Sequence, residues 1–234
     1  MKSVWVGVLA VSVIAGAAHA RAETRVGILG GADMTTLHQG EVLPTPGIHC
    51  DGFQYRRATQ FAAGGVVELG WRGNLALRLE PMYAAKGSKY PDPVCYFPEP
   101  PGHVPTPTPT KENDLRLSYL ELPVLLAVYA GRARLGPYFA GGPIVGYLAG
   151  ARVRRDGQEQ DVHGLLNRWA LGIAVGGGLR FTTGWAAVFV EGRYQLGLLG
   201  VGASGSYRPV SPQYASSRAR GPQILAGITC GVGH

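Results

Sequence analysis

The stretch LSYLELPVLL, residues 117–126, combines an apolar run with a glutamate and a proline, which is unusual for the buried strand of a soluble protein. Successive side chains of a β-strand point to opposite faces. One face would carry Leu120, Leu122, Val124, Leu126 and Val128, and the other Tyr119, Glu121 and Leu125. An apolar row backed by a row that includes a charge is typical of a wall between lipid and an enclosed lumen. Pro123 removes one backbone donor, so we expect a bulge or kink there.

Eight apolar-alternating segments of this kind follow one another along the chain. They lie near residues 25–36, 60–71, 75–87, 115–130, 134–152, 167–182, 185–198 and 220–232. Short connections around Gly73, Gly131 and Gly184 alternate strictly with long ones at 37–59, 88–114, 153–166 and 199–219. Membrane barrels combine short periplasmic turns with long outer loops. The sequence therefore predicts an all-β fold, an eight-stranded antiparallel up-and-down transmembrane β-barrel with short periplasmic turns and long extracellular loops.

The second long connection contains PEPPGHVPTPTPTKEND, residues 98–114. Its proline density favours extended chain over regular pairing. We interpret it as an outer loop. The alternative is a linker between two domains, which would leave three strands alone before it.

Composition agrees with a barrel wall. Among 234 residues there are 36 glycines, only 16% of residues are charged, and the mean hydropathy is +0.05. The net charge of +7 comes from scattered basic residues, and the densest cluster, Arg152, Arg154 and Arg155, is short. We therefore expect no nucleic-acid partner.

The N-terminus has the features of an export signal. Lys2 precedes the apolar run VWVGVLAVSVIAGAA, and the small-residue motifs AHA and ARA follow it. We expect residues 1–22 to be a signal peptide and residues 23–234 to form the barrel domain. An N-terminal membrane anchor is the alternative.

Charged residues recur on the face opposite the apolar rows. Both signs are present in near balance, at Glu68, Arg78, Glu80, Glu121, Arg180, Glu191 and Arg193. An eight-stranded barrel has an interior just wide enough for side chains, and a charge there is costly unless it is paired. We expect these seven residues to form a charge network across the lumen, with small inward residues such as Gly176 and Gly178 making room.

Three cysteines remain in a chain that we expect to be exported. Cys50 and Cys95 lie in turn-rich segments, whereas Cys230 lies in the apolar run ILAGITCGVG. An oxidising compartment favours a disulfide between Cys50 and Cys95, with Cys230 as a small apolar residue. The alternative is that all three thiols are free.

Three stretches resemble the PorT-type outer-membrane β-barrel family (outer membrane protein beta-barrel domain). They are YLELPVLL at 119–126, GPYFAGGPIVGYL at 136–148 and VGILGGADMTTL at 26–37. The resemblance implies a small barrel of the cell outer membrane, inserted by the barrel-assembly machinery, with no catalytic residues to transfer. Such barrels commonly end in an aromatic residue that is recognised during assembly, whereas this chain ends in Gly233-His234.

No motif for catalysis, a cofactor or a metal stands out. GASGS at 202–206 is not a nucleophile elbow, and no two histidines have zinc-ligand spacing. His163 and Ser118 are a candidate base and nucleophile, but many other pairs would serve equally well. We expect no enzyme activity, no cofactor and no metal.

The expected function is therefore that of a non-enzymatic integral outer-membrane barrel with a structural, interaction or secretion-accessory role in the envelope. Its partners would be outer-membrane lipid and an unknown ligand of the extracellular loops, and we expect a monomer. Three alternatives stay open: a narrow passive pore, a lipid-modifying outer-membrane enzyme, and a soluble exported β-barrel that binds an apolar ligand.

Overall fold

The computed structural model describes residues 23–38, 49–51, 56–71, 73–91, 94–96, 112–131, 133–155, 157–201 and 218–232. The expected signal peptide, residues 1–22, lies outside this part of the chain. Within the described ranges, no helix is long and apolar enough to cross a membrane.

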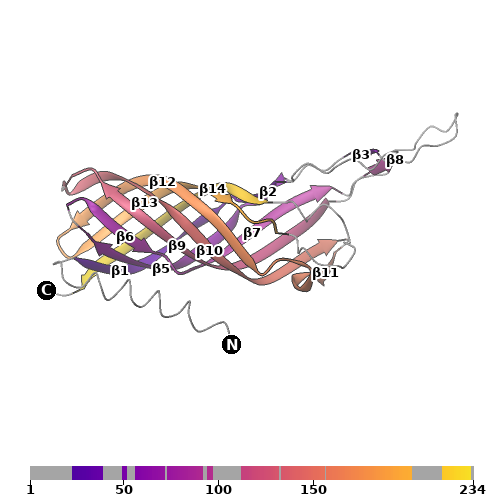
Figure 1. Cartoon of the computed structure of the whole chain (residues 1–234), viewed down its shortest axis with the longest axis horizontal. Coiled ribbons are helices and arrows are strands. Elements are labelled where there is room, and N and C mark those ends of the chain that lie inside the picture. The colour runs from indigo at the N-terminus through magenta and orange to yellow at the C-terminus, as the bar shows by residue number, and fades with distance from the viewer. Residues whose placement is uncertain are drawn as a thin grey trace.

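A ring of antiparallel strands forms the molecule (Figure 1). In ring order its members are β1 (Thr24–Asp33), β5 (Gln60–Gly70), the broken strand β6 (Leu75–Leu79) with β7 (Met82–Pro91), β9 (Glu112–Tyr129), β10 (Leu135–Arg155), β12 (Trp169–Thr183), β13 (Ala186–Gly197) and β14 (Arg218–Val232). The ring closes where β1 pairs with β14, Thr24 opposite Val232. The eight-stranded antiparallel barrel expected from the sequence is confirmed.

Shorter elements lie at the end of the barrel opposite the tight turns. β2 (Thr36–His38) pairs with β14, β4 (Arg56–Arg57) with β7, and β11 (Gln158–Asp161) with β10. The 3₁₀ turn η2 (His163–Leu165) follows β11. β3 (His49–Asp51) and β8 (Val94–Tyr96) form a separate two-stranded sheet. Because β7 and β9 pair side by side, the proline-rich segment between them connects neighbouring strands of one sheet.

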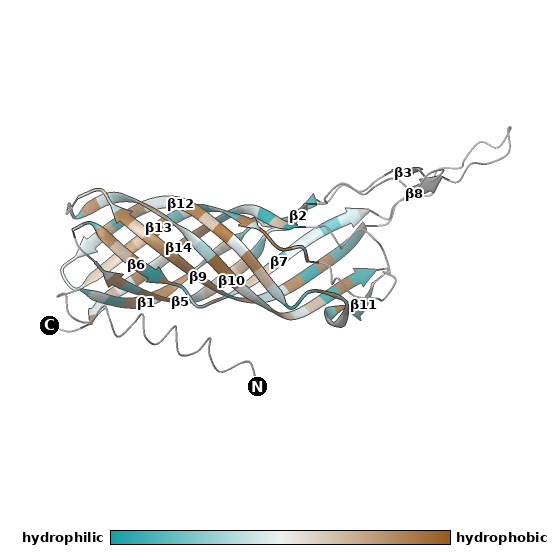
Figure 2. Ribbon diagram, viewed as in Figure 1, coloured by the Kyte–Doolittle hydropathy of each residue, from teal (hydrophilic) through white to brown (hydrophobic). Residues whose placement is uncertain are grey.

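The two faces of each strand have opposite chemistry. Apolar side chains such as Ile28, 67% exposed, and Phe139, 71% exposed, point outward, while charged side chains on the same barrel are buried. The middle of the barrel is accordingly brown in Figure 2, and the strand ends near β11 are teal. Along 117–128 the outward and inward rows are those expected from the sequence. A soluble ligand-binding barrel would need the reverse arrangement.

Glycines with positive φ close the tight turns. Gly73, Gly131 and Gly184 have φ values of 67°, 93° and 46°. Glycine occupies this left-handed region without the steric penalty that a Cβ imposes. Both ends of the ring, Thr24 and Val232, lie at the same end as these turns.

The bulge expected at Pro123 is absent. β9 runs through this residue, and its pairing with β6 and β7 keeps one register from Leu79 opposite Val124 to Met82 opposite Glu121. The neighbouring strand breaks instead at Glu80 and Pro81, where the Glu80 amide still donates to the Pro123 carbonyl at 3.1 Å. The one register shift between β9 and β10 lies between Leu148 and Gly150.

Candidate functional site: the charged lumen

Four charged side chains fill the centre of the lumen. The Arg78 guanidinium lies 2.7 Å from carboxylate oxygens of both Glu80 and Glu191. The Arg193 Nη1 atom lies 2.5 Å from Glu80 and 3.7 Å from Glu191. None of the four residues is more than 3% exposed. Each cation thus contacts both carboxylates.

These contacts span the full width of the barrel. Arg78 lies on β6 and Glu191 on β13, and four steps separate these strands in either direction around the ring. The Arg180 Nη1 atom, on β12, donates to Glu68 on β5 at 2.8 Å, and these strands are also opposite each other. The lumen charges therefore tie opposite walls together.

Small residues and aromatic rings shape the space around the central cluster. A Cβ added to Gly178 would lie 3.0 Å from the ring of Tyr138, and one added to Gly176 would lie 2.4 Å from the Arg193 Cβ. The Tyr138 hydroxyl donates to Glu191 at 2.7 Å, and the Arg78 guanidinium lies over the Phe189 ring. Inward glycines on β12 therefore leave room for the large side chains of the adjacent strands β10 and β13.

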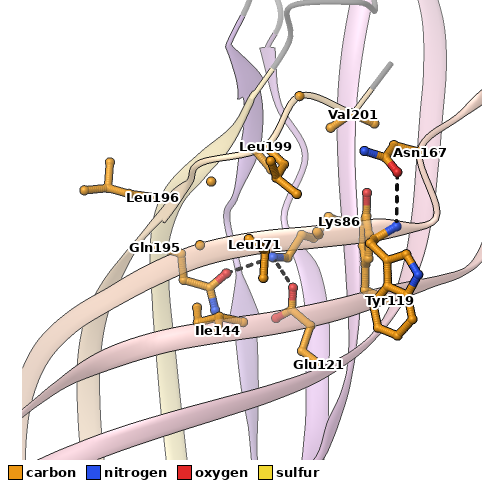
Figure 3. A pocket seen from close by; sticks show the side chains of 16 residues that line it. Lys86, Tyr119, Glu121, Ile144, Asn167, Leu171, Gln195, Leu196, Leu199 and Val201 are labelled. Atoms are coloured by element: carbon orange, nitrogen blue, oxygen red, sulfur yellow. Dashed lines mark hydrogen bonds and ion pairs between the residues drawn. The ribbon is translucent and has the colours of Figure 1, made fainter. Parts of the chain in front are cut away.

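Toward the outer end, Lys86 on β7 contacts side chains of the neighbouring strand β9 and of the opposite strand β13 (Figure 3). Its Nζ donates to Glu121 at 2.5 Å and to Gln195 at 2.8 Å. Gln195 also donates to Gln223, whose side-chain amide donates in turn to Asp33. Because Arg193 donates to Gln223 as well, this outer group is continuous with the central cluster.

At the turn end the lumen widens into a vestibule of about 680 Å³. Glu68 and Arg180 line this vestibule, and the Tyr129 hydroxyl donates to Glu68 at 2.7 Å. Arg25 also lines it and pairs with Glu23. The vestibule is thus bordered on the lumen side by the paired charges.

All seven residues of the expected network point into the lumen, and each contacts a residue of opposite charge. Lys86, Gln195, Gln223, Tyr129 and Tyr138 join them and were absent from the expected set. The alternation along β7 signals the position of Lys86, because it shares the face of Arg78 and Glu80. With Lys86 included, four cations face four carboxylates.

The candidate nucleophile and base each have another partner. The Ser118 Oγ and the Tyr83 hydroxyl form a hydrogen bond of 2.8 Å, while the His163 Nε2 lies 3.0 Å from the Leu148 carbonyl oxygen. Across the described residues, no group of three or more His, Cys, Asp or Glu side chains could hold a metal ion.

The backbone pairing places the two loop cysteines directly opposite each other. Cys50 on β3 faces Cys95 on β8 in the antiparallel register. Cys230, on β14, carries a free thiol. The disulfide itself stays a prediction.

Two comparisons with known proteins concern solved structures and curated proteins. The chain is similar to Neisserial surface protein A (11% identity, 89% of this chain and 97% of that chain, TM-score 0.48). It is also similar to OprG from Pseudomonas aeruginosa (10% identity, 91% and 97%, TM-score 0.43) and to Ail, the attachment invasion locus protein of Yersinia pestis (12% identity, 90% and 99%, TM-score 0.39). No match was found among curated proteins.

A third comparison concerns families. Residues 18–201 match the family described as "Outer membrane protein beta-barrel domain". This match covers most of the chain, including every strand of the ring except β14. The chain belongs to the outer membrane protein beta-barrel domain family and is a β-barrel protein of the cell outer membrane.

Proposed function

We propose that this protein is a non-enzymatic outer-membrane barrel with a closed lumen, which acts in the envelope through its outer loops. One observation carries the proposal: the buried ion pairs join opposite walls at the centre of the barrel. Water and solutes would have to separate these pairs in order to pass, and separating buried charges is costly. Within the wider family, we assign the chain to the PorT-type barrels on the three stretches that resemble them.

The same arrangement supports a monomeric state and a non-enzymatic role. The chain closes its own ring, which supports a monomer that needs only outer-membrane lipid and the assembly machinery. The partners of Ser118 and His163 support a non-enzymatic role. If the protein modified lipids, mass spectrometry of outer-membrane lipids would show a new species on expression; we expect none.

Conductance tests the closed lumen against the narrow pore. The mature barrel in planar bilayers should show no steady conductance, whereas Glu191→Ala combined with Arg193→Ala should conduct, because this double variant removes both central cross-lumen contacts, Arg78–Glu191 and Arg193–Glu80. Glu159→Ala, on exposed β11, is the matched control and should stay silent. Steady conductance of the unmodified barrel at the level of the double variant would contradict the proposal and favour the pore.

A further inference from the structure

A small cavity in the barrel wall, near the outer end, lies between lumen-facing and outward-facing side chains. Its volume is about 40 Å³. On the lumen side it is lined by Lys86, Glu121 and Gln195, and on the outward side by Leu171, Leu196 and Leu199 (Figure 3). The cavity therefore reaches from the polar interior to the apolar surface of the wall.

The wall has a gap here because β12 and β13 no longer pair. Pairing between β12 and β13 ends at Gly172 opposite Gly197. Beyond it the chain turns across β12, where the Leu198 amide donates to the Leu171 carbonyl at 2.8 Å. Gly172, Gly197 and Gly200 all line the cavity and place no side chain between its two sides.

Glu121, which lines the cavity, has a carboxylate oxygen with no hydrogen-bond partner. Lys86 occupies the Oε1 atom of Glu121, but the buried Oε2 atom accepts no hydrogen bond from any described residue. The Glu121 side chain is only 2% exposed. A buried carboxylate oxygen without a donor is costly, so this site favours a group that donates a hydrogen bond.

The aromatic residues around the cavity are typical of the membrane–water interface at the outer end of the barrel. Trp169, at the start of β12, lines the cavity, is 58% exposed and packs edge-on against Tyr147 at 5.4 Å between ring centroids. Aromatic side chains of membrane barrels gather at the level of the lipid headgroups. An apolar tail over Leu196 and Leu199 would lie in lipid, with its polar end directed inward.

We propose that this cavity binds a small amphiphile with an apolar tail and a hydrogen-bond-donating head such as a hydroxyl. The head enters beside Lys86 and donates to Glu121 Oε2, and the tail lies along Leu171, Leu196 and Leu199. A volume of about 40 Å³ accommodates a hydroxyl-sized group but no chain. Because the central cluster lies beneath, the site binds its ligand without passing it through the lumen.

Because Trp169 lines the cavity, its fluorescence can report binding there. In the mature barrel in detergent micelles, Trp71 and Trp185 are replaced by Phe, and 11-bromoundecanol is added as a quencher. We expect saturable quenching of Trp169. A reporter that keeps only Trp185, at the turn end, measures partition into the micelle. Equal, non-saturating quenching at both positions would overturn the proposal.

The head group and the cavity are tested separately. The methyl ether of 11-bromoundecanol has the same tail but no donor, so it should bind roughly tenfold more weakly or worse to the unmodified site. Ala219→Leu, which fills the lining, should abolish saturable quenching, while Ala226→Leu, on the outward face of the same strand, should leave it unchanged. Equal affinity for alcohol and ether would overturn the proposal even if Ala219→Leu failed to fold, and neither result depends on whether the lumen conducts.

Discussion

Arg78 shows how much a single lumen side chain holds in place. It is 1% exposed, it contacts Glu80 and Glu191, and its guanidinium lies over the rings of Tyr138 and Phe189. Two large effects oppose each other at such a site: the desolvation of the charges is unfavourable, and their attraction at short range is favourable. The network is stable as a set because each carboxylate has a cation within reach.

Arg78→Met should therefore destabilise the barrel strongly. The methionine keeps much of the side-chain volume but leaves Glu80 and Glu191 with Arg193 as their one remaining central cation. Breaking one member of a buried pair costs about 3–5 kcal/mol. The free energy of unfolding in detergent, measured by urea titration of the unboiled gel band, should fall by that order.

A double-mutant cycle separates lost pairing from lost packing. Arg78→Met with Glu191→Gln should cost less than the sum of the two single changes, because the first change already removes the closest cation of Glu191. Glu159→Gln, at an exposed pair with 3.6 Å between Arg152 and Glu159, is the control and should shift stability by under about 1 kcal/mol. Strict additivity at Arg78 and Glu191 would show that the two charges are not coupled.

The sequence predicts which side chains enter the lumen but not which partners they find. Alternation alone places Arg78 and Glu191 on inward faces. The predicted up-and-down order places the segments of Arg78 and Glu191 opposite each other in the ring. That the two side chains meet depends also on the stagger of the strands, which no local pattern encodes. The role of Gln223, which links Arg193 to Gln195, follows from the same non-local geometry.

The inward glycines of β12 set how closely its neighbouring strands, β10 and β13, can pack against it. A Cβ at Gly178 would lie 2.2 Å from the Val190 carbonyl oxygen and 3.0 Å from the Tyr138 ring. Gly178→Val should therefore prevent tight closure and lower the yield of folded barrel. Gly192→Val is the matched control, because a Cβ there meets nothing within 4 Å and faces outward. Equal folding yields of the two variants, measured as the unboiled fraction on gels, would contradict this packing argument.

Strand bounds are predictable where apolar alternation continues and less so beyond it. The expected segment 134–152 becomes β10, which ends at Arg155, and the expected segment 115–130 becomes β9, which begins at Glu112. Apart from Val153, the extra residues are polar, and they pair outside the apolar belt. Likewise, Pro123 predicts a bulge in its own strand, whereas the break lies in the neighbouring strand at Glu80 and Pro81, where Pro81 itself has no backbone donor.

The cysteines of β3 and β8 occupy opposed positions in the pairing of the two strands. Cys50 and Cys95 face each other in register, and an oxidising compartment favours a bond between them. Purified protein denatured without reductant should therefore react with one equivalent of maleimide, at Cys230, and with three after reduction. Cys50→Ser should expose the Cys95 thiol and give two equivalents without reductant. Three equivalents from the unreduced protein would show that no bond forms.

The whole molecule is held by closure, since every ring strand has a neighbour on both sides. Turn alternation and two-faced strands were enough to predict this architecture, because a membrane barrel satisfies its backbone hydrogen bonds only by closing. The cavity between β12 and β13 was beyond such reasoning. It arises where pairing ends at Gly172 and Gly197. The expected segment 185–198 ends there, but the expected segment 167–182 starts before Gly172, so the pattern does not show that β12 loses its neighbour at this point.

Closure predicts heat-dependent migration in SDS gels. The unboiled mature barrel should run faster than the boiled one, because the closed ring resists the detergent until it is heated. Removing residues 218–234 deletes β14 and leaves β1 and β13 with open edges, so the fast band should disappear. Replacing β11, which pairs with β10 outside the ring, by a short turn should leave the fast band in place. If the shortened chain without β14 kept a heat-sensitive fast band, resistance to SDS would arise from the paired lumen charges and not from closure, because the ring would then be open.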